Sequence, residues 1–279
     1  MAEMTRRAFV CGHPVAHSRS PVIHDYWLRR LGLSGSYERI DVPPEEFADF
    51  LRDFPRMGFV GGNVTLPHKQ AAFSLSETDA AARRIGAVNT LWLEDGKVCG
   101  TNTDALGFLA NLDDQAPQWR RAKTATVLGA GGAARAILYA LKQSGIVNIR
   151  IVNRTLTRAL ELAQEFSPGP GVAPWESLPS LLKDTDLLVN TTSLGMGGQG
   201  GWGFDLATMP RHAVVTDIVY IPLETPLLRA ARLRELATVD GLGMLLHQAV
   251  PGFTRWFGRK PEVTAELRQL VIADLEAGQ

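Results

Sequence analysis

The chain has 279 residues, of which 45% are hydrophobic and 21% charged, a composition that fits two globular domains with a hydrophobic core each. Lys and Arg total 29, as do Asp and Glu, so the formal net charge is zero. A chain without net charge or a basic stripe has no long-range attraction to nucleic acid or to an acidic membrane surface, and we expect neither partner.

The apolar run that follows Arg7 ends at Pro14 and is too short for a signal peptide. No uncharged stretch is long enough to span a membrane. The two cysteines, Cys11 and Cys99, lack the spacing of a disulfide framework or of a metal site. We therefore expect a cytoplasmic protein without a metal ion.

Strand and helix patterns alternate in the first part of the chain and predict a β-α-β-α-β run. The expected strands are 7–12, 36–42 and 58–65, and the expected helices are 22–32 and 43–54. Ser20 and Pro21 suit the N-cap and the first position of the first helix. Alternating residues on both sides of Asp95-Gly96 predict a type I′ hairpin within 89–104.

A second strand–helix series begins at Lys123. Segments 124–145 and 148–166 each read as a strand followed by a helix, and further strands are expected within 184–193 and 212–220. The Pro- and Gly-rich segments 167–174 and 195–203 are interpreted as loops. Helical patterns return at 244–258 and 261–277, and we expect these helices to pack on the first domain.

The segment VLGAGGAARA follows a predicted strand and opens a helix, the context in which a Gly-rich turn binds a dinucleotide. Gly129 suits the tight turn, Gly131 lets the backbone approach the pyrophosphate, and Ala134 takes the position where the helix packs on the strand. The helix start then directs N–H groups toward the phosphates. The alternative is an ordinary Gly-rich turn between a strand and a helix.

The end of the next strand, at VNRTLTR, indicates which cofactor binds. An NAD site places an acidic residue about 20 residues after the glycines, where it accepts hydrogen bonds from the ribose. Here Asn153 and Arg154 occupy that place, and Arg158 lies one helical turn further on. A guanidinium can bind a 2′-phosphate, so the sequence favours NADP over NAD. The alternative is a pair of solvated arginines at a helix start.

These patterns predict an α/β fold with mainly parallel sheets. We expect an N-terminal α/β domain at 1–105, a Rossmann-type nucleotide-binding domain at 106–240, and C-terminal helices at 241–279. The C-terminal helices would complete the first domain, which is then discontinuous, and a cleft would lie between the two domains.

Outside the nucleotide segment, polar side chains stand at expected strand ends and helix starts. They are Ser18, Ser20, Asn63, Thr65, Lys69, Asn89, Asp104, Tyr220 and Gln248. In α/β proteins the carboxyl ends of strands form the ligand site. Hydroxyls and amides with one cation and one carboxylate suit a polyhydroxylated anion better than an apolar ligand or a metal.

Eight motifs, in this order along the chain, resemble those of the shikimate dehydrogenase family. They are GHPVAHSRSP, NVTLPHK, GAVNT, GTNTD, GAGGAAR, NRTLTR, DIVY and DGLGMLLHQA. The resemblance implies an oxidoreductase that uses NADPH to reduce 3-dehydroshikimate to shikimate in aromatic amino-acid biosynthesis. The N-terminal domain would then bind the substrate. The oligomeric state, monomer or homodimer, stays open.

The resemblance also implies a role for each matching residue. Substrate contacts are expected from Ser18 and Ser20, which would bind the carboxylate, and from Asn63, Thr65, Asn89, Tyr220 and Gln248. Lys69 and Asp104 would be the catalytic pair. The expected pyrophosphate contacts are Gly129, Ala130, Gly131, Gly132 and Ala133, and those of the adenosine ribose and its phosphate are Asn153, Arg154, Thr155 and Arg158. Ile218, where Met is common in the family, and Gly241 would lie near the nicotinamide.

Lys69 is the expected proton donor to the alkoxide that hydride transfer creates, since an ammonium group stabilises the developing charge. Asp104 or a chain of waters could share the proton, and which group is the main carrier stays open. The structural alternatives are a surface lysine for Lys69 and a helix N-cap for Asp104.

Two other functions stay open beside this one. Quinate or an aminoshikimate would be the substrate of a related enzyme with the same motifs. A non-catalytic NADP-binding regulatory protein could share the fold, but it would have no need of Lys69 or Asp104, and both are present.

Overall fold

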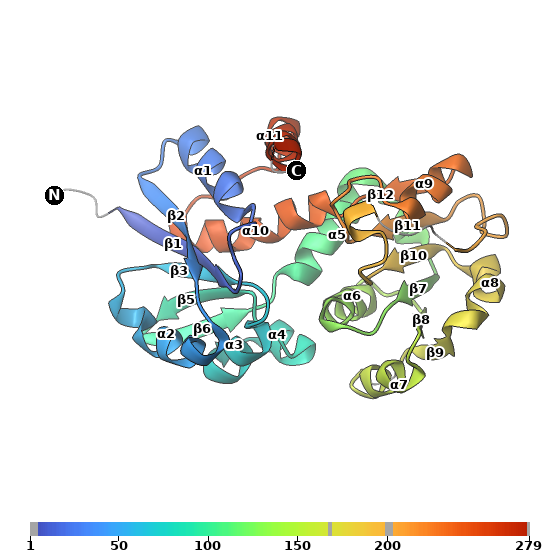
Figure 1. Ribbon diagram of the computed structural model, residues 1–279, viewed down its shortest axis with the longest axis horizontal. Coiled ribbons are helices and arrows are strands. Elements are labelled where there is room, and N and C mark those ends of the chain that lie inside the picture. The colour runs from blue at the N-terminus through green and yellow to red at the C-terminus, as the bar shows by residue number, and fades with distance from the viewer. Residues whose placement is uncertain (1–4, 167–168, 199–202, 278–279) are drawn as a thin grey trace. The chain divides into compact units, whose positions relative to one another are not determined.

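The computed structural model describes residues 5–166, 169–198 and 203–277. The chain forms two compact units (Figure 1). The first unit comprises Met1–Asp104 and Leu246–Gln279, and the second comprises Ala105–Leu245. The first unit is therefore built from two separate stretches of the sequence, and each unit has a sheet of its own.

The sheet of the first unit is mixed, with six strands among the described residues. They are β1 (Arg6–Gly12), β2 (Gly35–Asp41), β3 (Gly61–Val64), β4 (Glu77–Thr78), β5 (Thr90–Glu94) and β6 (Lys97–Thr101), in the order β2-β1-β3-β5-β6-β4. β1 is parallel to β2 and β3, whereas β5 is antiparallel to β3 and β6. Asp95 and Gly96 both have a positive φ, which confirms the predicted type I′ hairpin.

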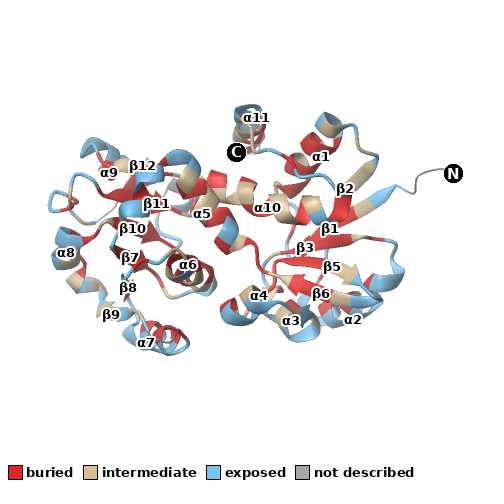
Figure 2. Cartoon of the chain, turned by 180° about the vertical axis from the view of Figure 1, so that it is seen from behind, coloured by how far each residue is buried: buried red, intermediate tan, exposed pale blue. Residues whose placement is uncertain are grey.

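Helices from both ends of the chain contribute to this unit. They are α1 (Ser20–Leu31), α2 (Phe47–Asp53), α3 (Lys69–Leu75), α4 (Ala80–Ile85), α10 (Leu242–Phe257) and α11 (Ala265–Ala277), and α5 (Asp104–Gln115) begins at the last residue of the first stretch. Phe9, Phe47 and Leu91 belong to one buried core. The indole N–H of Trp256 in α10 donates to the carbonyl of Leu91 at 2.9 Å, so a late helix is tied directly to a strand formed early in the sequence (Figures 1 and 2).

Helix α1 begins one residue earlier than the sequence predicts. Ser20 is its first residue, and Arg19 occupies the N-cap without a capping side chain. The prediction that Ser20 caps this helix is therefore wrong: the amide of Ser20 instead donates to the hydroxyl of Ser18 at 3.4 Å. Gly32 ends the helix in the left-handed conformation, as predicted.

The sheet of the second unit is parallel at every described strand pair. Its strands are β7 (Thr124–Leu128), β8 (Asn148–Asn153), β9 (Gly171–Pro174), β10 (Leu187–Asn190), β11 (Val214–Asp217) and β12 (Ala237–Val239), in the order β12-β11-β10-β7-β8-β9. The order reverses between β7 and β10, which is the Rossmann topology and confirms the predicted α/β class. The central strands are buried along their length (Figure 2).

Helices α6 (Gly132–Gln143), α7 (Leu156–Gln164), α8 (Leu178–Leu181) and α9 (Pro226–Leu233) accompany this sheet. The prediction of a loop over 167–174 is wrong in its second half, because Gly171–Pro174 pair with β8 as strand β9. Residues 167–168 of that segment lie outside the described residues. So do residues 199–202 of the predicted loop 195–203, whose described part contains a short 3-10 turn at Met196–Gly198.

Across the described ranges, no helix combines the length and the apolar character that crossing a membrane requires. Within the same ranges, no three His, Cys, Asp or Glu side chains come together in the way a metal site needs. Cys11 and Cys99 are both buried, and each is a free thiol.

Candidate active site

The ammonium group of Lys69 and the carboxylate of Asp104 form the centre of a polar cluster in the first unit. Lys69 is the first residue of α3 and Asp104 the first residue of α5, so two helix starts bring the pair together. Nζ of Lys69 donates to Oδ2 of Asp104 at 2.6 Å. The two side chains are 28% and 17% exposed, so the ion pair is shielded but a ligand can still reach it.

Asn89, which directly precedes β5, connects this ion pair to neighbouring strands and to α10. Its Nδ2 donates to Oδ1 of Asp104 at 2.8 Å, and its Oδ1 accepts from the backbone N–H and the hydroxyl of Thr103 at 2.9 and 3.1 Å. Gln248 of α10 places Oε1 at 3.5 Å from both Asn89 Nδ2 and Thr103 Oγ1. The structure thus brings Lys69, Asn89, Asp104 and Gln248 into one hydrogen-bonded cluster.

Asn63 and Thr65 lie at the carboxyl end of β3. Asn63 is buried, its Oδ1 accepts from the hydroxyl of Tyr37 at 2.5 Å, and its Nδ2 donates to the carbonyl of Asn89 at 3.0 Å and to Oγ1 of Thr90 at 3.2 Å. Thr65 follows the strand and is less buried. The carboxamide of Asn63 therefore joins β2, β3 and the start of β5, while the side chain of Thr65 lies against Gly12 at the end of β1.

Ser18 and Ser20 lie at the start of α1. The carbonyl of Ser18 accepts from Nε and Nη2 of Arg39 at 3.1 and 2.8 Å, which holds the loop before the helix against β2. Ser20 is buried, whereas Ser18 is half-buried. Among the described residues no hydrogen bond links either serine directly to Lys69 or Asp104.

The Gly-rich turn joins β7 to α6 in the second unit. The predicted pyrophosphate residues are Gly129, Ala130 and Gly131 in this turn and Gly132 and Ala133 at the start of α6. Gly129 has a φ of +102°, and a Cβ there would lie 2.8 Å from Oγ1 of Thr191, so the turn requires glycine at this position. A Cβ on Gly131 or Gly132 would meet nothing within 4 Å. The first turn of α6 has no side-chain cap, which leaves its N–H groups available to an anion.

The predicted ribose-phosphate residues lie where β8 ends, beside the Gly-rich turn, because β7 and β8 are adjacent parallel strands. Asn153 ends β8, and its Nδ2 donates at 2.7 Å to the carbonyl of Thr155, the N-cap residue of α7. Arg154 and Arg158 are exposed, and the described residues provide neither with an ion-pair partner. The first turn of α7 has no acidic residue, so two cations lie at a helix N-terminus, where an anion would be stabilising.

Ile218, Tyr220 and Gly241, the predicted nicotinamide and substrate contacts of this unit, follow β11 and β12. A Cβ on Gly241 would collide with the carbonyl of Ile218, so these two backbones lie against each other. Tyr220 is half-buried. All three positions are therefore near the carboxyl edge of the same parallel sheet that carries the Gly-rich turn.

Asp217, a residue that the sequence patterns did not single out, fixes the segment after β11. Its side chain is fully buried and accepts from the hydroxyl of Thr225 at 2.7 Å, from the backbone N–H of Val219 at 3.0 Å and from Nδ2 of Asn190 at 3.0 Å. Burial raises the pKa of Asp217 above its ordinary value. Its place in the DIVY motif is a signal that could have identified it.

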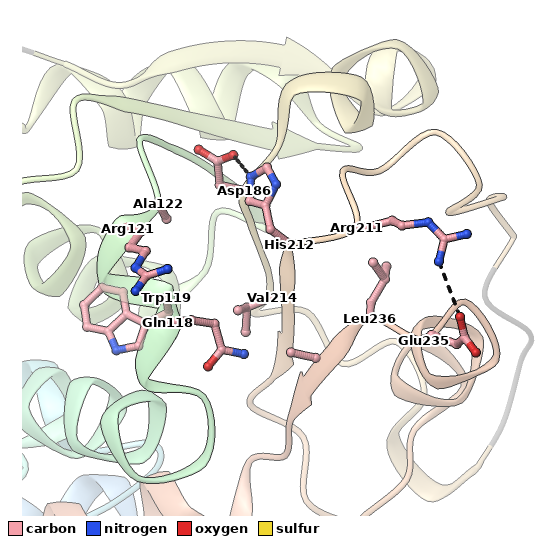
Figure 3. Close-up of a pocket in the computed structure, with 11 residues that line it drawn as sticks. Gln118, Trp119, Arg121, Ala122, Asp186, Arg211, His212, Val214, Glu235 and Leu236 are labelled. Atoms are coloured by element: carbon pink, nitrogen blue, oxygen red, sulfur yellow. Dashed lines mark hydrogen bonds and ion pairs between the residues drawn. The ribbon is translucent and has the colours of Figure 1, made fainter.

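A pocket of about 550 Å³ lies at the opposite, amino-terminal edge of the same sheet (Figure 3). Asp186 directly precedes β10 and Val214 begins β11. Two pairs of side chains in the pocket face each other: Nε2 of His212 is 2.9 Å from Oδ1 of Asp186, and Nη1 of Arg211 donates to Glu235 at 3.4 Å (Figure 3). None of the predicted site residues lines this pocket, so it is distinct from the candidate active site.

Three family models match successive parts of the chain. They are the shikimate dehydrogenase substrate binding domain at residues 10–91, shikimate / quinate 5-dehydrogenase at 112–195, and the shikimate 5′-dehydrogenase C-terminal domain at 241–270. A shikimate dehydrogenase (NADP(+)) of Chelativorans sp. (strain BNC1) is 61% identical over 280 residues, an alignment that covers 100% of both chains. The chain belongs to the shikimate dehydrogenase family.

Solved structures of this family have the same fold over almost the whole chain. Shikimate 5-dehydrogenase of Thermus thermophilus, in complex with NADP(H) and shikimate, is 38% identical with a TM-score of 0.86, covering 96% of this chain and 99% of that one. Quinate dehydrogenase of Corynebacterium glutamicum, in complex with NAD, is 30% identical with a TM-score of 0.87 and the same coverage. The same fold is therefore found in complex with NADP(H) and shikimate in one relative and with NAD in the other.

Three residues of the cluster in the first unit were not predicted as site residues from the sequence: Tyr37, Thr90 and Thr103. Thr103 lies within GTNTD and Thr90 ends GAVNT, so membership of a motif was an available signal for both. Tyr37 carries no such signal, because 26 residues separate it from Asn63, its hydrogen-bond partner. Only the pairing of β2, β1 and β3 brings the two side chains together.

Proposed function

We propose that the chain is an NADP-dependent shikimate dehydrogenase that reversibly reduces 3-dehydroshikimate to shikimate in aromatic amino-acid biosynthesis. The observation that carries the proposal is the ion pair of Lys69 and Asp104, at 2.6 Å, with Asn89 hydrogen-bonded to the same carboxylate. The relative of this name at 61% identity supports it. The free thiols of Cys11 and Cys99 suit the reducing cytoplasm, where we place the reaction.

The substrate would bind in the first unit. Its carboxylate suits the hydroxyls of Ser18 and Ser20 at the start of α1, and its ring hydroxyls suit Thr65, Asn89 and Gln248. Both N–H groups of the Asn63 amide already have acceptors, so we assign this residue to the wall of the pocket. Tyr220 is a further candidate substrate contact.

NADP would bind in the second unit. The uncapped start of α6 and the open space at Gly131 fit a pyrophosphate, and Arg154 and Arg158 fit a 2′-phosphate. Asn153 and Thr155 would hold the ribose, with Ile218 and Gly241 beside the nicotinamide. When bound, NADPH supplies the hydride that the ketone carbon accepts.

Lys69 would supply the proton that completes the reduction. As the ketone carbon is reduced, its oxygen gains negative charge, which an ammonium group stabilises before donating a proton to it. Asp104 holds Nζ of Lys69 through Oδ2, and Asn89 fixes the other carboxylate oxygen. In the reverse direction, Nζ would receive the proton of the substrate hydroxyl, with the carboxylate of Asp104 beside it.

Quinate is the second candidate substrate, because a quinate dehydrogenase of 30% identity has the same fold at a TM-score of 0.87. Quinate has an additional hydroxyl on the carbon that bears the carboxylate, and the region of Ser18, Ser20 and Thr65 would have to admit it. That relative was solved with NAD, whereas Arg154 and Arg158 favour a cofactor with a 2′-phosphate.

A steady-state assay distinguishes these candidates. NADPH oxidation is followed with 3-dehydroshikimate, and the reverse reaction is followed with shikimate or quinate, each combined with NADP or NAD. We expect the highest kcat/KM for shikimate with NADP. Absence of turnover of shikimate with both cofactors would contradict the proposal, and a higher kcat/KM for quinate would establish the second candidate instead.

The role of Lys69 is tested by Lys69→Met, which keeps an unbranched side chain without the charge. We expect kcat to fall by about 10²- to 10⁴-fold, as loss of a general acid does, with little change in KM. Lys97→Met is the matched control, because Lys97 also forms an ion pair in the first unit, with Glu77 at 2.7 Å, but is exposed. A rise in KM with wild-type kcat would make Lys69 a binding residue only.

A further inference from the structure

A run of buried hydrogen bonds leads from Tyr37 on β2 to the carboxylate of Asp104. The hydroxyl of Tyr37 donates to Oδ1 of Asn63 at 2.5 Å, and Nδ2 of Asn63 donates to Oγ1 of Thr90 at 3.2 Å. Thr90 Oγ1 donates to Oδ1 of Asn89 at 2.9 Å, and Nδ2 of Asn89 donates to Asp104 at 2.8 Å. The four residues before Asp104 are each at most 5% exposed, so water does not compete for these bonds.

Backbone groups fix the direction of both carboxamides in this run. Nδ2 of Asn63 lies 3.0 Å from the carbonyl of Asn89, which can only accept, so Oδ1 must be the atom that faces Tyr37. Oδ1 of Asn89 lies 2.9 Å from the backbone N of Thr103, which can only donate, so Nδ2 must be the atom that faces Asp104. The hydroxyl of Tyr37 is therefore a donor, and the run has one direction.

Packing holds the ring of Tyr37 in place. The ring of His24 is stacked on it, with 3.9 Å between the centroids and 5° between the planes, and the ring of Trp256 lies 6.0 Å away. Burial lowers the pKa of His24 to about 3, which keeps that ring neutral, and burial raises the pKa of Tyr37 above its ordinary value. Tyr37 thus keeps both its position and the proton that it donates.

We propose that Tyr37 is a positioning residue for the reaction: through Asn63 and Thr90 it orients the carboxamide of Asn89, and thereby the carboxylate of Asp104 that holds Lys69. Tyr37 belongs to none of the eight family motifs. The inference rests on the proposed dehydrogenase function. Tyr37 acts on the reaction only through the other members of the run, because it is itself buried.

Removing the hydroxyl of Tyr37 leaves Oδ1 of Asn63 buried without this donor. A buried polar atom without its partner causes local rearrangement, and Asn63 cannot simply rotate, since Oδ1 would then face the carbonyl of Asn89. The displacement passes instead to Thr90 and to Asn89. A misplacement of about 1 Å at groups that contact the reacting atoms can lower the rate by about 10²-fold.

The test compares Tyr37→Phe with Tyr26→Phe. Tyr26 is a matched control, because it is also buried in the first unit and its hydroxyl also has partners, Thr264 at 3.0 Å and Glu266 at 2.9 Å, but these lie outside the run. We expect Tyr37→Phe to lower kcat by about tenfold with little change in the KM of shikimate, and Tyr26→Phe to keep the wild-type kcat. Thermal unfolding of both variants reports any loss of stability separately.

A second pair of variants tests the same run of hydrogen bonds at Thr90. If Tyr37→Phe fails to fold, the Thr90 variants alone test whether the run is needed for a wild-type kcat. We expect Thr90→Val, which lacks the hydroxyl, to lower kcat, and Thr90→Ser, which keeps it, to restore kcat. Because both changes interrupt one run, the double variant of Tyr37→Phe and Thr90→Val should lose no more than the worse single variant.

Three outcomes would overturn the inference. The first is a wild-type kcat in Tyr37→Phe, or in both Thr90 variants. The second is a double variant whose loss of kcat is the product of the two single losses. In both cases the wild-type enzyme turns over shikimate, so the proposed function is unaffected. The third is a wild-type enzyme without activity on shikimate, which would contradict the function and the inference together.

Discussion

Arg154 is the side chain to which we assign the proposed preference for NADP over NAD. It is exposed at the end of β8, next to the Gly-rich turn, and has no ion-pair partner among the described residues. A hydrogen bond to a charged group contributes about 1.5–3 kcal/mol, which is roughly a 10- to 150-fold change in affinity. We therefore expect Arg154→Ala to raise the KM of NADP by roughly that factor, and the KM of NAD by much less.

Arg211→Ala provides the control for this measurement. Arg211 is an exposed arginine of the same unit, at the opposite edge of the sheet (Figure 3). Its loss should alter neither cofactor's KM. An equal loss of NADP and NAD affinity in Arg154→Ala would contradict a role in binding the 2′-phosphate.

At the scale of single residues, the sequence predicted which side chains belong to the cluster better than it predicted their hydrogen-bond partners. Lys69, Asn89, Asp104 and Gln248 do form one hydrogen-bonded group. The hydrogen bond that Asn63 accepts from Tyr37 was not predictable, because Tyr37 lies on a strand two places away in the sheet. Motifs record short-range spacing, whereas hydrogen bonds between strands depend on register.

At the scale of elements, the two glycines of the turn between β7 and α6 have different requirements. Gly129→Ala would place a Cβ 2.8 Å from Thr191 at a φ of +102°, so we expect the free energy of unfolding to fall by about 1–3 kcal/mol. Gly131→Ala meets nothing within 4 Å and should leave stability unchanged. The new methyl group would however occupy the approach to the pyrophosphate, so NADP affinity should fall roughly tenfold, about 1.4 kcal/mol.

Urea unfolding and NADP titration of both glycine variants separate these effects. Gly132→Ala is the control for stability, since its Cβ also meets open space. An NADP affinity equal to wild type in Gly131→Ala would argue against this turn as the pyrophosphate site. A loss of stability in Gly131→Ala would show that the fold itself requires glycine at position 131.

Long periodic elements were predicted well, and short edge elements were not. The strand–turn–helix at β7 and α6 follows from a local pattern of apolar and glycine residues. The edge strand β9 lies in a Pro- and Gly-rich segment that is typical of a loop, and its pairing with β8 depends on residues about 20 positions away. The helix start at α1 also differed from prediction, because Ser18 and Arg19 precede the helix in a conformation that Ser–Pro alone does not specify.

At the scale of the whole molecule, stability should depend on pH through His24. Its pKa is about 3 in the folded protein, because the ring is buried, and 6.5 is the ordinary value. Between these values the unfolded chain binds a proton that the folded protein does not. The free energy of unfolding should therefore decrease as the pH falls from 6.5 toward 3, by up to about 1.4 kcal/mol per pH unit from this residue.

Urea unfolding at pH 7 and pH 4.5 measures this contribution. His24→Phe keeps an aromatic ring beside Tyr37 without a titratable group, and its stability should fall less between the two pH values than that of the wild type. His17→Gln, at an exposed position, is the control and should retain the wild-type difference. If the free energy of unfolding of His24→Phe fell between pH 7 and pH 4.5 by as much as that of the wild type, the conclusion that His24 is buried and neutral would be contradicted.

The alternation of strands and helices was enough to predict the α/β class, and the spacing of the glycines was enough to predict a dinucleotide fold. That the first sheet combines parallel and antiparallel strands was harder to predict from the sequence. Its β5–β6 hairpin was predicted from Asp95-Gly96, but the placement of that hairpin beside β3 depends on contacts between distant parts of the sequence.

The division of the first unit between two stretches of sequence has a consequence for protein synthesis. The ribosome completes Ala105–Leu245, a continuous unit, before it has made the rest of α10 and all of α11. Until then, the carbonyl of Leu91 lacks the indole of Trp256, and Asn89 lacks Gln248. The second unit is thus complete in sequence before the first, whose hydrogen bonds to Trp256 and Gln248 can form only after the last part of the chain has been made.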